Sequence, residues 1–124
     1  MSFIQSLFGG KSDSNKQPKL WNDMSTMEDL QRATEESYNQ KVVIFKHSTR
    51  CFISKTVLQN FERDMPTEMP GVKFYFLDLI RYRAISNEIE NRFNVTHQSP
   101  QVIILENGKA IKNASHQSID FTMI

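Results

Sequence analysis

The chain of 124 residues contains a single cysteine, Cys51, and this scarcity excludes several kinds of protein. One cysteine cannot form a disulfide within the chain, and it cannot supply the thiolate cluster of a structural zinc site. Such a composition suits a reducing compartment, so we expect a cytoplasmic protein. Any disulfide reaction of Cys51 has to proceed without a second cysteine of the same chain.

An excess of one charge and a long apolar run are also lacking. The 15 Lys and Arg residues nearly balance the 14 Asp and Glu residues, and no basic stripe alternates with aromatics, so we expect no nucleic-acid partner. No stretch approaches the roughly 20 apolar residues of a membrane span. Residues 1–8 lack the apolar core and cleavage site of a secretory signal. With 39% hydrophobic and 23% charged residues, the composition is that of one globular domain.

The first 19 residues differ from the rest of the chain. The apolar residues of segment 3–8 would share one face of a short helix that is stopped by the glycines at 9–10. Residues 11–19 are polar and are interpreted as a tether. We therefore predict an amphipathic segment and tether over residues 1–19 and a folded domain over residues 20–124. Docking of the first eight residues on the domain, a partner or a membrane surface stays open.

Periodicity along residues 20–124 predicts alternating strands and helices. In order, we expect an edge strand near 20–21, a helix from about 25 to 38, a strand at 41–45, a helix at 51–63, a strand at 72–77, a helix around 85–93, strands at 102–105 and 109–112, and a short terminal helix. Asn107-Gly108 is typical of a hairpin turn. Parallel crossovers followed by a hairpin predict an α/β fold with a mixed sheet of four to five strands flanked by helices.

The sequence patterns of two predicted helices are regular enough to predict which residues face the core. Ser25 and Glu28 are expected to form a capping box that begins the first helix. Its inward stripe is predicted to be Met27, Leu30, Ala33 and Thr34. The inward stripe of the helix that follows Cys51 is predicted to be Ile53, Val57, Leu58 and Phe61.

Cys51 lies where a predicted strand ends, a polar loop follows and a helix begins. The unpaired N–H groups and the positive end of the helix dipole favour a thiolate there. No acidic residue occurs between Ser37 and Phe61, whereas that stretch contains Lys41, Lys46, His47, Arg50 and Lys55. These cations would also attract an anionic thiol substrate. The alternative is a small buried hydrophobe, but a structural cysteine usually lies among apolar residues.

Ser99-Pro100 directly precedes a predicted buried strand. Proline cannot donate to a strand ladder and therefore belongs at the first position of a strand. Local sequence does not choose between a cis and a trans bond here. The spacing of His47, His97 and His116 from one another and from Cys51 matches no recognisable metal set, so we expect no metal.

Three segments resemble the monothiol bacilliredoxin family, which has a thioredoxin-like fold. They are Phe-Lys-His-Ser-Thr-Arg-Cys-Phe-Ile-Ser at residues 45–54, Ser-Pro-Gln at 99–101 and Ala-Ser-His at 114–116. The resemblance covers residues 20–124 and implies a cis Ser99–Pro100 bond that faces the thiol. One departure is Phe52, which stands where the family has proline; it restores a backbone N–H and adds a bulky ring.

The resemblance implies a monothiol thiol–disulfide oxidoreductase that removes bacillithiol from S-bacillithiolated cytosolic proteins through a mixed disulfide on Cys51. Ser54 stands where dithiol relatives carry a second cysteine, so an external thiol or a partner reductase must regenerate Cys51. Bacillithiol, whose malate carboxylates suit Lys46, Arg50 and helix-start N–H groups, would be the thiol co-substrate. We expect a monomer with no tightly bound cofactor.

Roles for the remaining site residues follow from the resemblance and from local chemistry. Lys46, His47 and Arg50 are predicted to stabilise the thiolate or support its loop. The predicted substrate-binding residues are Ser48, Thr49, Phe52, Ser54, Ser99, Pro100, Ser115 and His116. Simpler alternatives are an exposed histidine without a role for His47, a strand-start turn for Ser99 and a helix cap for Ser115.

Two other functions compete with this interpretation. The order Cys-Phe-Ile-Ser at residues 51–54 has the Cys-x-x-Ser form of monothiol glutaredoxins that hold an iron–sulfur cluster between two subunits. Those proteins carry glycine after the cysteine, and the bulk of Phe52 argues against close bridging of a cluster. The second alternative is a non-catalytic adaptor in which Cys51 senses oxidation by becoming S-thiolated.

Overall fold

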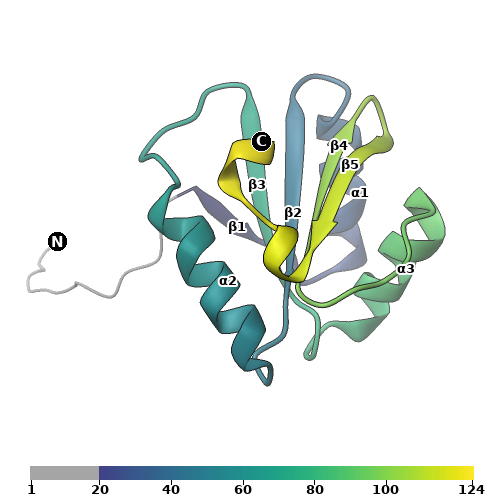
Figure 1. The fold of residues 1–124 in the computed structure, drawn as a ribbon. Coiled ribbons are helices and arrows are strands. Elements are labelled where there is room, and N and C mark those ends of the chain that lie inside the picture. The colour runs from purple at the N-terminus through teal and green to yellow at the C-terminus, as the bar shows by residue number, and fades with distance from the viewer. Residues whose placement is uncertain (1–19) are drawn as a thin grey trace, which may run out of the picture.

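The computed structural model describes residues 20–124, which form a five-stranded sheet covered by helices (Figure 1). The strands are β1 (Trp21–Asp23), β2 (Lys41–His47), β3 (Val72–Asp78), β4 (Gln101–Glu106) and β5 (Lys109–Ser115). The helices are α1 (Met27–Glu36), α2 (Phe52–Arg63) and α3 (Arg83–Phe93), followed by the 3₁₀ turns η2 (His116–Ser118) and η3 (Phe121–Met123). The predicted order of elements is confirmed from β1 to β5. The segment and tether predicted over residues 1–19 lie outside the described residues.

Strand β2 lies at the centre of the sheet, whose order is β1-β3-β2-β4-β5. It runs parallel to β3, which pairs with β1 in parallel, and antiparallel to β4, which forms a hairpin with β5. Every residue of β2 after Lys41 is buried, as the apolar run predicted for a strand covered on both faces. The pairing of Lys46 with Gln101, and of Gln101 with Ser115, brings the end of β2, the start of β4 and the end of β5 to one edge.

The two faces of the sheet carry separate apolar clusters because successive strand residues point in opposite directions. Val43 and Phe45 of β2 pack with Val57 and Phe61 of α2. Val42 and Ile44 pack on the other face, against a set from α1 and α3 that comprises Leu30, Ala33, Ile85 and Ile89. Helix α2 therefore covers one face and helices α1 and α3 cover the other (Figure 1).

The capping box of α1 is displaced by one residue from its predicted place. Thr26 and Asp29 form it: the Asp29 N–H donates to Thr26 Oγ1 at 3.0 Å, and the Thr26 N–H donates to Asp29 Oδ2 at 3.1 Å. The Ser25 N–H also donates to Asp29 Oδ2, at 2.9 Å. This backbone bond is the main cause that holds the pKa of Asp29 at about 2. The prediction of Ser25 and Glu28 was wrong because two overlapping pairs share the same spacing.

Helix faces were predicted correctly in the middle of each helix and wrongly in the first turn. Leu30 and Ala33 are buried, as are Val57 and Phe61. By contrast, Met27 and Ile53 are each 42% exposed, although they continue the same stripes. Periodicity identifies which face of a helix is apolar, but the sheet decides how far along the helix that face is covered.

The C-terminal part of the chain differs from prediction after the hairpin. Asn107 and Gly108 both have positive φ, 55° and 76°, as the two central residues of the predicted tight turn require. Strand β5 then continues to Ser115, three residues beyond its predicted end. The predicted terminal helix is replaced by η2 and η3, each of three residues. None of the helices in residues 20–124 is long and apolar enough to cross a membrane.

Candidate active site

Cys51 is the N-cap residue of α2. Its backbone is extended, with φ −109° and ψ 120°, and its Sγ accepts a hydrogen bond from the Ser54 N–H at 3.4 Å. The Cys51 carbonyl accepts from the Lys55 N–H at 3.1 Å, which begins the helical ladder. Sulfur thus occupies the place of a capping side-chain oxygen, and a negative charge on Sγ faces the positive end of the helix dipole.

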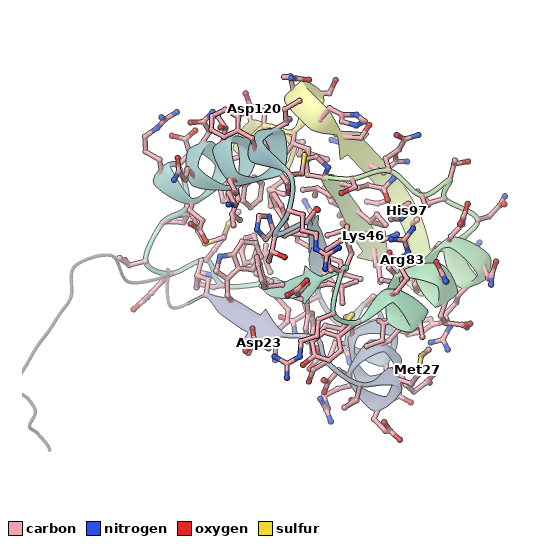
Figure 2. All side chains as sticks on the ribbon, turned by 90° about the horizontal axis from the view of Figure 1, so that it is seen from below. Asp23, Met27, Lys46, Arg83, His97 and Asp120 are labelled. Atoms are coloured by element: carbon pink, nitrogen blue, oxygen red, sulfur yellow. The ribbon has the colours of Figure 1, made fainter. Side chains whose placement is uncertain are left out.

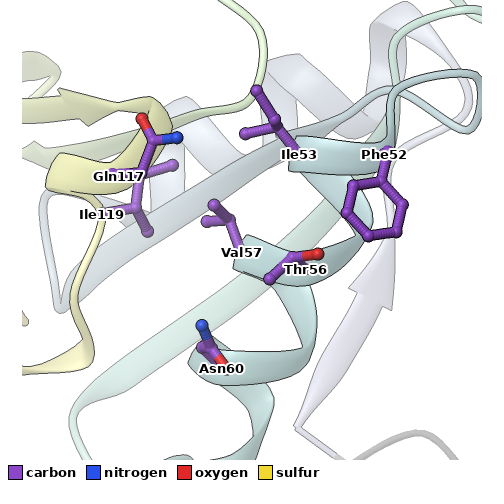
Figure 3. Close-up of a pocket in the computed structure, with 7 residues that line it drawn as sticks. All are labelled: Phe52, Ile53, Thr56, Val57, Asn60, Gln117 and Ile119. Atoms are coloured by element: carbon purple, nitrogen blue, oxygen red, sulfur yellow. The ribbon is translucent and has the colours of Figure 1, made fainter.

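The neighbours of Cys51 in the sequence, Arg50 and Phe52, are exposed. Cys51 itself is half-buried, and the next residue, Phe52, is 81% exposed. Figure 3 shows the Phe52 ring standing beside the first turn of α2 rather than under it. The loop residues Thr49 and Arg50 are exposed as well. Of the predicted substrate-binding residues on this side, Thr49 and Phe52 are therefore available for contact.

A buried hydrogen-bonded group holds the loop that leads to Cys51. The fully buried Ser54 Oγ lies 2.8 Å from His47 Nδ1 and accepts from the Ser48 N–H at 3.0 Å. Burial lowers the pKa of His47, which fits a neutral ring whose Nδ1 accepts the Ser54 hydroxyl proton. These bonds correct the predicted roles of Ser48 and Ser54: both are buried braces of the loop, not contacts for a substrate.

Lys46 does not lie beside the thiol. Phe45 packs towards α2, so its neighbour Lys46 points to the opposite face of the sheet. Its Nζ donates to the Ser86 carbonyl at 3.3 Å and lies 3.4 Å from His97 Nδ1 (Figure 2). Complete burial lowers the pKa of Lys46 to about 8. Lys46 was predicted to stabilise the thiolate. In the structure its amino group instead makes a buried contact with Ser86 of α3.

Of the lysines and arginines, Arg50 and Lys55 lie nearest to Cys51 in the sequence. Arg50 directly precedes Cys51 in the exposed loop, and Lys55 is exposed in the first turn of α2. Burial is the main cause that lowers the pKa of His47; the charge of Asp78 opposes this shift and the charge of Lys55 adds to it. A role for Arg50 beside the thiol therefore stays a prediction, whereas the Lys46 amino group lies at Ser86 and His97.

The second predicted segment lies at the same edge of the sheet. The Ser99–Pro100 peptide bond is cis, in agreement with the expectation, and Pro100 is buried while Ser99 is half-buried. The Pro100 carbonyl accepts from the His116 N–H at 3.1 Å, which ties this loop to the end of β5. Ser115 and His116 are half-buried, and the Ser115 side chain makes no capping bond, so the helix-cap alternative does not apply.

A groove runs along α2 next to the cysteine (Figure 3). Its volume is about 290 Å³, and it is lined by Phe52, Ile53, Thr56, Val57, Asn60, Gln117 and Ile119. Of these lining residues, only Phe52 was predicted from the sequence to contact a substrate. Nothing in the sequence shows that residues 117–119 fold back beside α2, so the groove has no local signal.

Side chains that could bind a metal ion do not cluster in the described part of the chain. Residues 20–124 contain no group of three or more His, Cys, Asp or Glu side chains arranged to hold a metal ion. The Cys51 thiol, which accepts from the Ser54 N–H at the start of a helix, is of a kind suited to nucleophilic exchange with a disulfide.

Comparison with known proteins agrees with this geometry. The sequence model of a family described as monothiol bacilliredoxin BrxC matches residues 22–124. A solved protein described as a proposed oxidoreductase with a thioredoxin fold is 30% identical, with 83% of this chain and 88% of that chain covered and a TM-score of 0.68. Thioredoxin from Fasciola hepatica is 19% identical (82% and 90% covered, TM-score 0.65), and that from Trypanosoma brucei brucei is 21% identical (85% of each covered, TM-score 0.63). The predicted thioredoxin-like fold is confirmed.

Proposed function

Because this chain belongs to the monothiol bacilliredoxin family, we propose that it removes bacillithiol from S-bacillithiolated proteins. Family and fold support a redox function carried by a thiol. The observation that carries the finer proposal is the single, half-exposed Cys51 at the start of α2, with a buried serine in place of a second thiol. A thiol in this setting reacts with disulfides but cannot resolve the product alone.

The first step is exchange between thiolate and disulfide. The Cys51 thiolate attacks the bacillithiol sulfur of the mixed disulfide, a new S–S bond forms to Cys51, and the bond to the target cysteine breaks. The target sulfur leaves as a thiolate and takes a proton from solvent. One disulfide is consumed and one is formed, so the step needs no oxidant, reductant or metal.

The second step regenerates Cys51. Ser54 cannot act as a resolving group, because a hydroxyl cannot take the place of a thiol in disulfide exchange; its hydroxyl is instead bonded to His47 Nδ1 and the Ser48 N–H. A low-molecular-weight thiol, or the thiol of a partner reductase, attacks the bacillithiol sulfur and releases the Cys51 thiolate. We place this cycle in the cytoplasm, where thiols are kept reduced, and assign it to a monomer.

Recognition of bacillithiol needs positive charge for its malate carboxylates. Arg50, Lys55 and the first N–H groups of α2 supply it on the side of the thiol. Ser99 and Pro100 contribute backbone at the same edge of the sheet, and His116 is tied to them through the Pro100 carbonyl. Lys46, buried against α3, takes no part.

Mass spectrometry and kinetics test the proposal together. A purified target protein carrying bacillithiol is incubated with this protein in the absence of other thiols. The target should be released in reduced form, and Cys51 should gain the mass of bacillithiol. The Cys51→Ser variant should release no target, while adding free bacillithiol should restore turnover to the wild type. Release by the serine variant, or no adduct on Cys51, would contradict the proposal.

A further inference from the structure

The loop that leads from α3 to Ser99 and Pro100 has no backbone hydrogen bonds of its own. Residues 95–99 lie outside the helices and strands, and within the described residues 20–124 none of them takes part in a backbone–backbone bond. The next such bond along the chain joins the Pro100 carbonyl to the His116 N–H at 3.1 Å. The backbone groups of such a segment must be bonded by side chains or by solvent. The position of the loop therefore depends on the side chains that reach it.

Two side chains bond to consecutive residues of this loop. Glu90 on α3 accepts, through Oε2, from the His97 N–H at 3.2 Å. Gln101, the first residue of β4, donates through Nε2 to the Thr96 carbonyl at 2.9 Å. The His97 ring adds a contact with α3, because its Nδ1 lies 3.3 Å from Ser86 Oγ (Figure 2). The loop is thus held from α3 on one side and from the sheet on the other.

Gln101 occupies its place at a cost to stability. The residue is 1% exposed, and its Oε1 has no hydrogen-bond partner among residues 20–124. Turning the amide over would not help, because Oε1 would then face the Thr96 carbonyl, which is also an acceptor. A methionine of similar length would bury no unpartnered polar atom of this kind. The glutamine is therefore explained by its bond to the loop and not by its contribution to the core.

The placement of the loop matters because the loop ends at Ser99, on the edge of the sheet where the thiol lies. Lys46 of β2 pairs with Gln101 of β4 in antiparallel register. Continued by two residues, this register sets Ser99 opposite Ser48. The Ser48 carbonyl accepts from the Cys51 N–H at 3.2 Å and so closes the turn that carries the thiol. A displaced loop would move Ser99 relative to Cys51 without breaking the bonds of this turn or of the start of α2.

We propose that Glu90 and Gln101 are positioning residues for disulfide exchange at Cys51. Neither contacts the reacting sulfurs; together they hold the loop so that Ser99 presents its backbone to the mixed disulfide. Glu90 serves as a hydrogen-bond acceptor, so its oxygen is required and its charge is not. This inference rests on the proposed function, to which it adds the residues that set the geometry of the bound disulfide.

Two reactions of Cys51 separate positioning from general damage. One is exchange with the mixed disulfide of a surface-cysteine protein, prepared with either bacillithiol or 2-mercaptoethanol and followed in single turnover. The other is alkylation by iodoacetamide, which needs the thiolate but no docked disulfide. Both are measured, together with urea unfolding, for wild type, Gln101→Met, Glu90→Ala and Glu90→Gln. Glu88→Ala is the matched control, because Glu88 lies on the same helix and its carboxylate accepts from Arg92 Nε at 3.2 Å.

Gln101→Met and Glu90→Ala should each slow exchange about tenfold, because a displaced loop leaves the bound disulfide out of line for attack. Their alkylation rates should match that of wild type, since the start of α2 is unchanged. Gln101→Met should unfold at a urea concentration no lower than wild type does, because it removes the buried unpartnered oxygen. Glu90→Gln should keep the exchange rate, because its amide oxygen can accept from the His97 N–H. Glu88→Ala should keep both rates.

Three results would overturn the assignment. They are exchange at the wild-type rate in either Gln101→Met or Glu90→Ala, a loss of alkylation equal to the loss of exchange, and a loss in Glu90→Gln as large as that in Glu90→Ala. If Glu90→Ala does not fold, slow exchange by Gln101→Met with wild-type exchange by Glu90→Gln supports the proposal, and any other combination overturns it. Wild type that reacts with the 2-mercaptoethanol substrate but not with the bacillithiol one would refute the proposed function, while the loop would still be tested on the former.

Discussion

The buried amino group of Lys46 gives a sharp test of the structure. Burial lowers its pKa from 10.5 to about 8. Below pH 8 the lysine is charged in both the folded and the unfolded chain. The folded state then carries the full free-energy penalty of burying a charged amino group. As pH rises from 8 to 10.5, the folded state holds a neutral amine while the unfolded state still binds a proton, so the penalty is relieved and stability rises. At 1.36 kcal/mol per pKa unit, the penalty at pH 7 is about 3 kcal/mol.

Replacing Lys46 by methionine keeps a flexible side chain of similar length and removes this penalty. The variant loses the contacts of Nζ with the Ser86 carbonyl and His97 Nδ1, which offset about 1 kcal/mol. We therefore expect Lys46→Met to be more stable than wild type by about 2 kcal/mol at pH 7. Since the penalty falls by about 2 kcal/mol between pH 7 and pH 9.5, the two proteins should be nearly equal at the higher pH.

Urea unfolding at several pH values measures this difference directly, because the titration of all other groups cancels between the two proteins. The exposed residue Lys109 provides a matched control, and Lys109→Met should change stability by less than about 0.5 kcal/mol at every pH. The rate of disulfide exchange by Lys46→Met should stay close to that of wild type, because Nζ lies against α3. A destabilised variant, a difference that does not depend on pH, or a large loss of exchange rate would refute the reasoning.

Three further substitutions probe the loop, the helix start and the edge of the sheet. Ser54→Ala leaves His47 Nδ1 and the Ser48 N–H without their partner, so it should destabilise the fold by about 2–4 kcal/mol in urea unfolding, whereas the exposed Ser118→Ala should not. Phe52→Pro should fold as well as wild type, because a first-turn proline removes no helical hydrogen bond, and it should change the rate of exchange with disulfides; unchanged kinetics across several disulfides would make the Phe52 ring irrelevant. Burial raises the pKa of Glu62, whose carboxylate accepts from Trp21 Nε1 at 2.8 Å. Glu62→Gln should therefore be more stable than wild type at pH 7 in thermal unfolding, and the gap should close as pH falls and Glu62 takes up its proton; a gap that widens towards acid pH would be incompatible with this sign.

Much of the fold was predictable because it depends on local patterns. The mainly apolar segments of β2 and β4 predict strands covered on both faces, and Asn107-Gly108 predicts the turn whose two residues need positive φ. The placement of Cys51 at the start of α2 was also local, since a polar loop between an apolar strand and an amphipathic stripe leaves few other positions. These features follow from backbone geometry over a few residues.

The chemistry around the thiol was only partly predictable. Counting charge along the sequence placed Lys46, Arg50 and Lys55 together, but a strand sends successive side chains to opposite faces. Alternation shows that Lys46 and Phe45 diverge, yet only the packing of α2 on the side of Phe45 decides which of them faces the thiol. Ser54 likewise stands one turn after Cys51, and only its burial against His47 shows that it braces the loop.

The sequence by itself determined that one thiol begins a helix, that no second thiol can resolve it and that cations lie nearby. The tertiary structure alone decided which cations share its side of the sheet, and it built the groove beside Cys51 from α2 and a segment some 60 residues later in the chain. Local rules report which dihedral angles and faces a short stretch prefers. The meeting of distant segments depends instead on how the whole core packs, which no short stretch of sequence encodes.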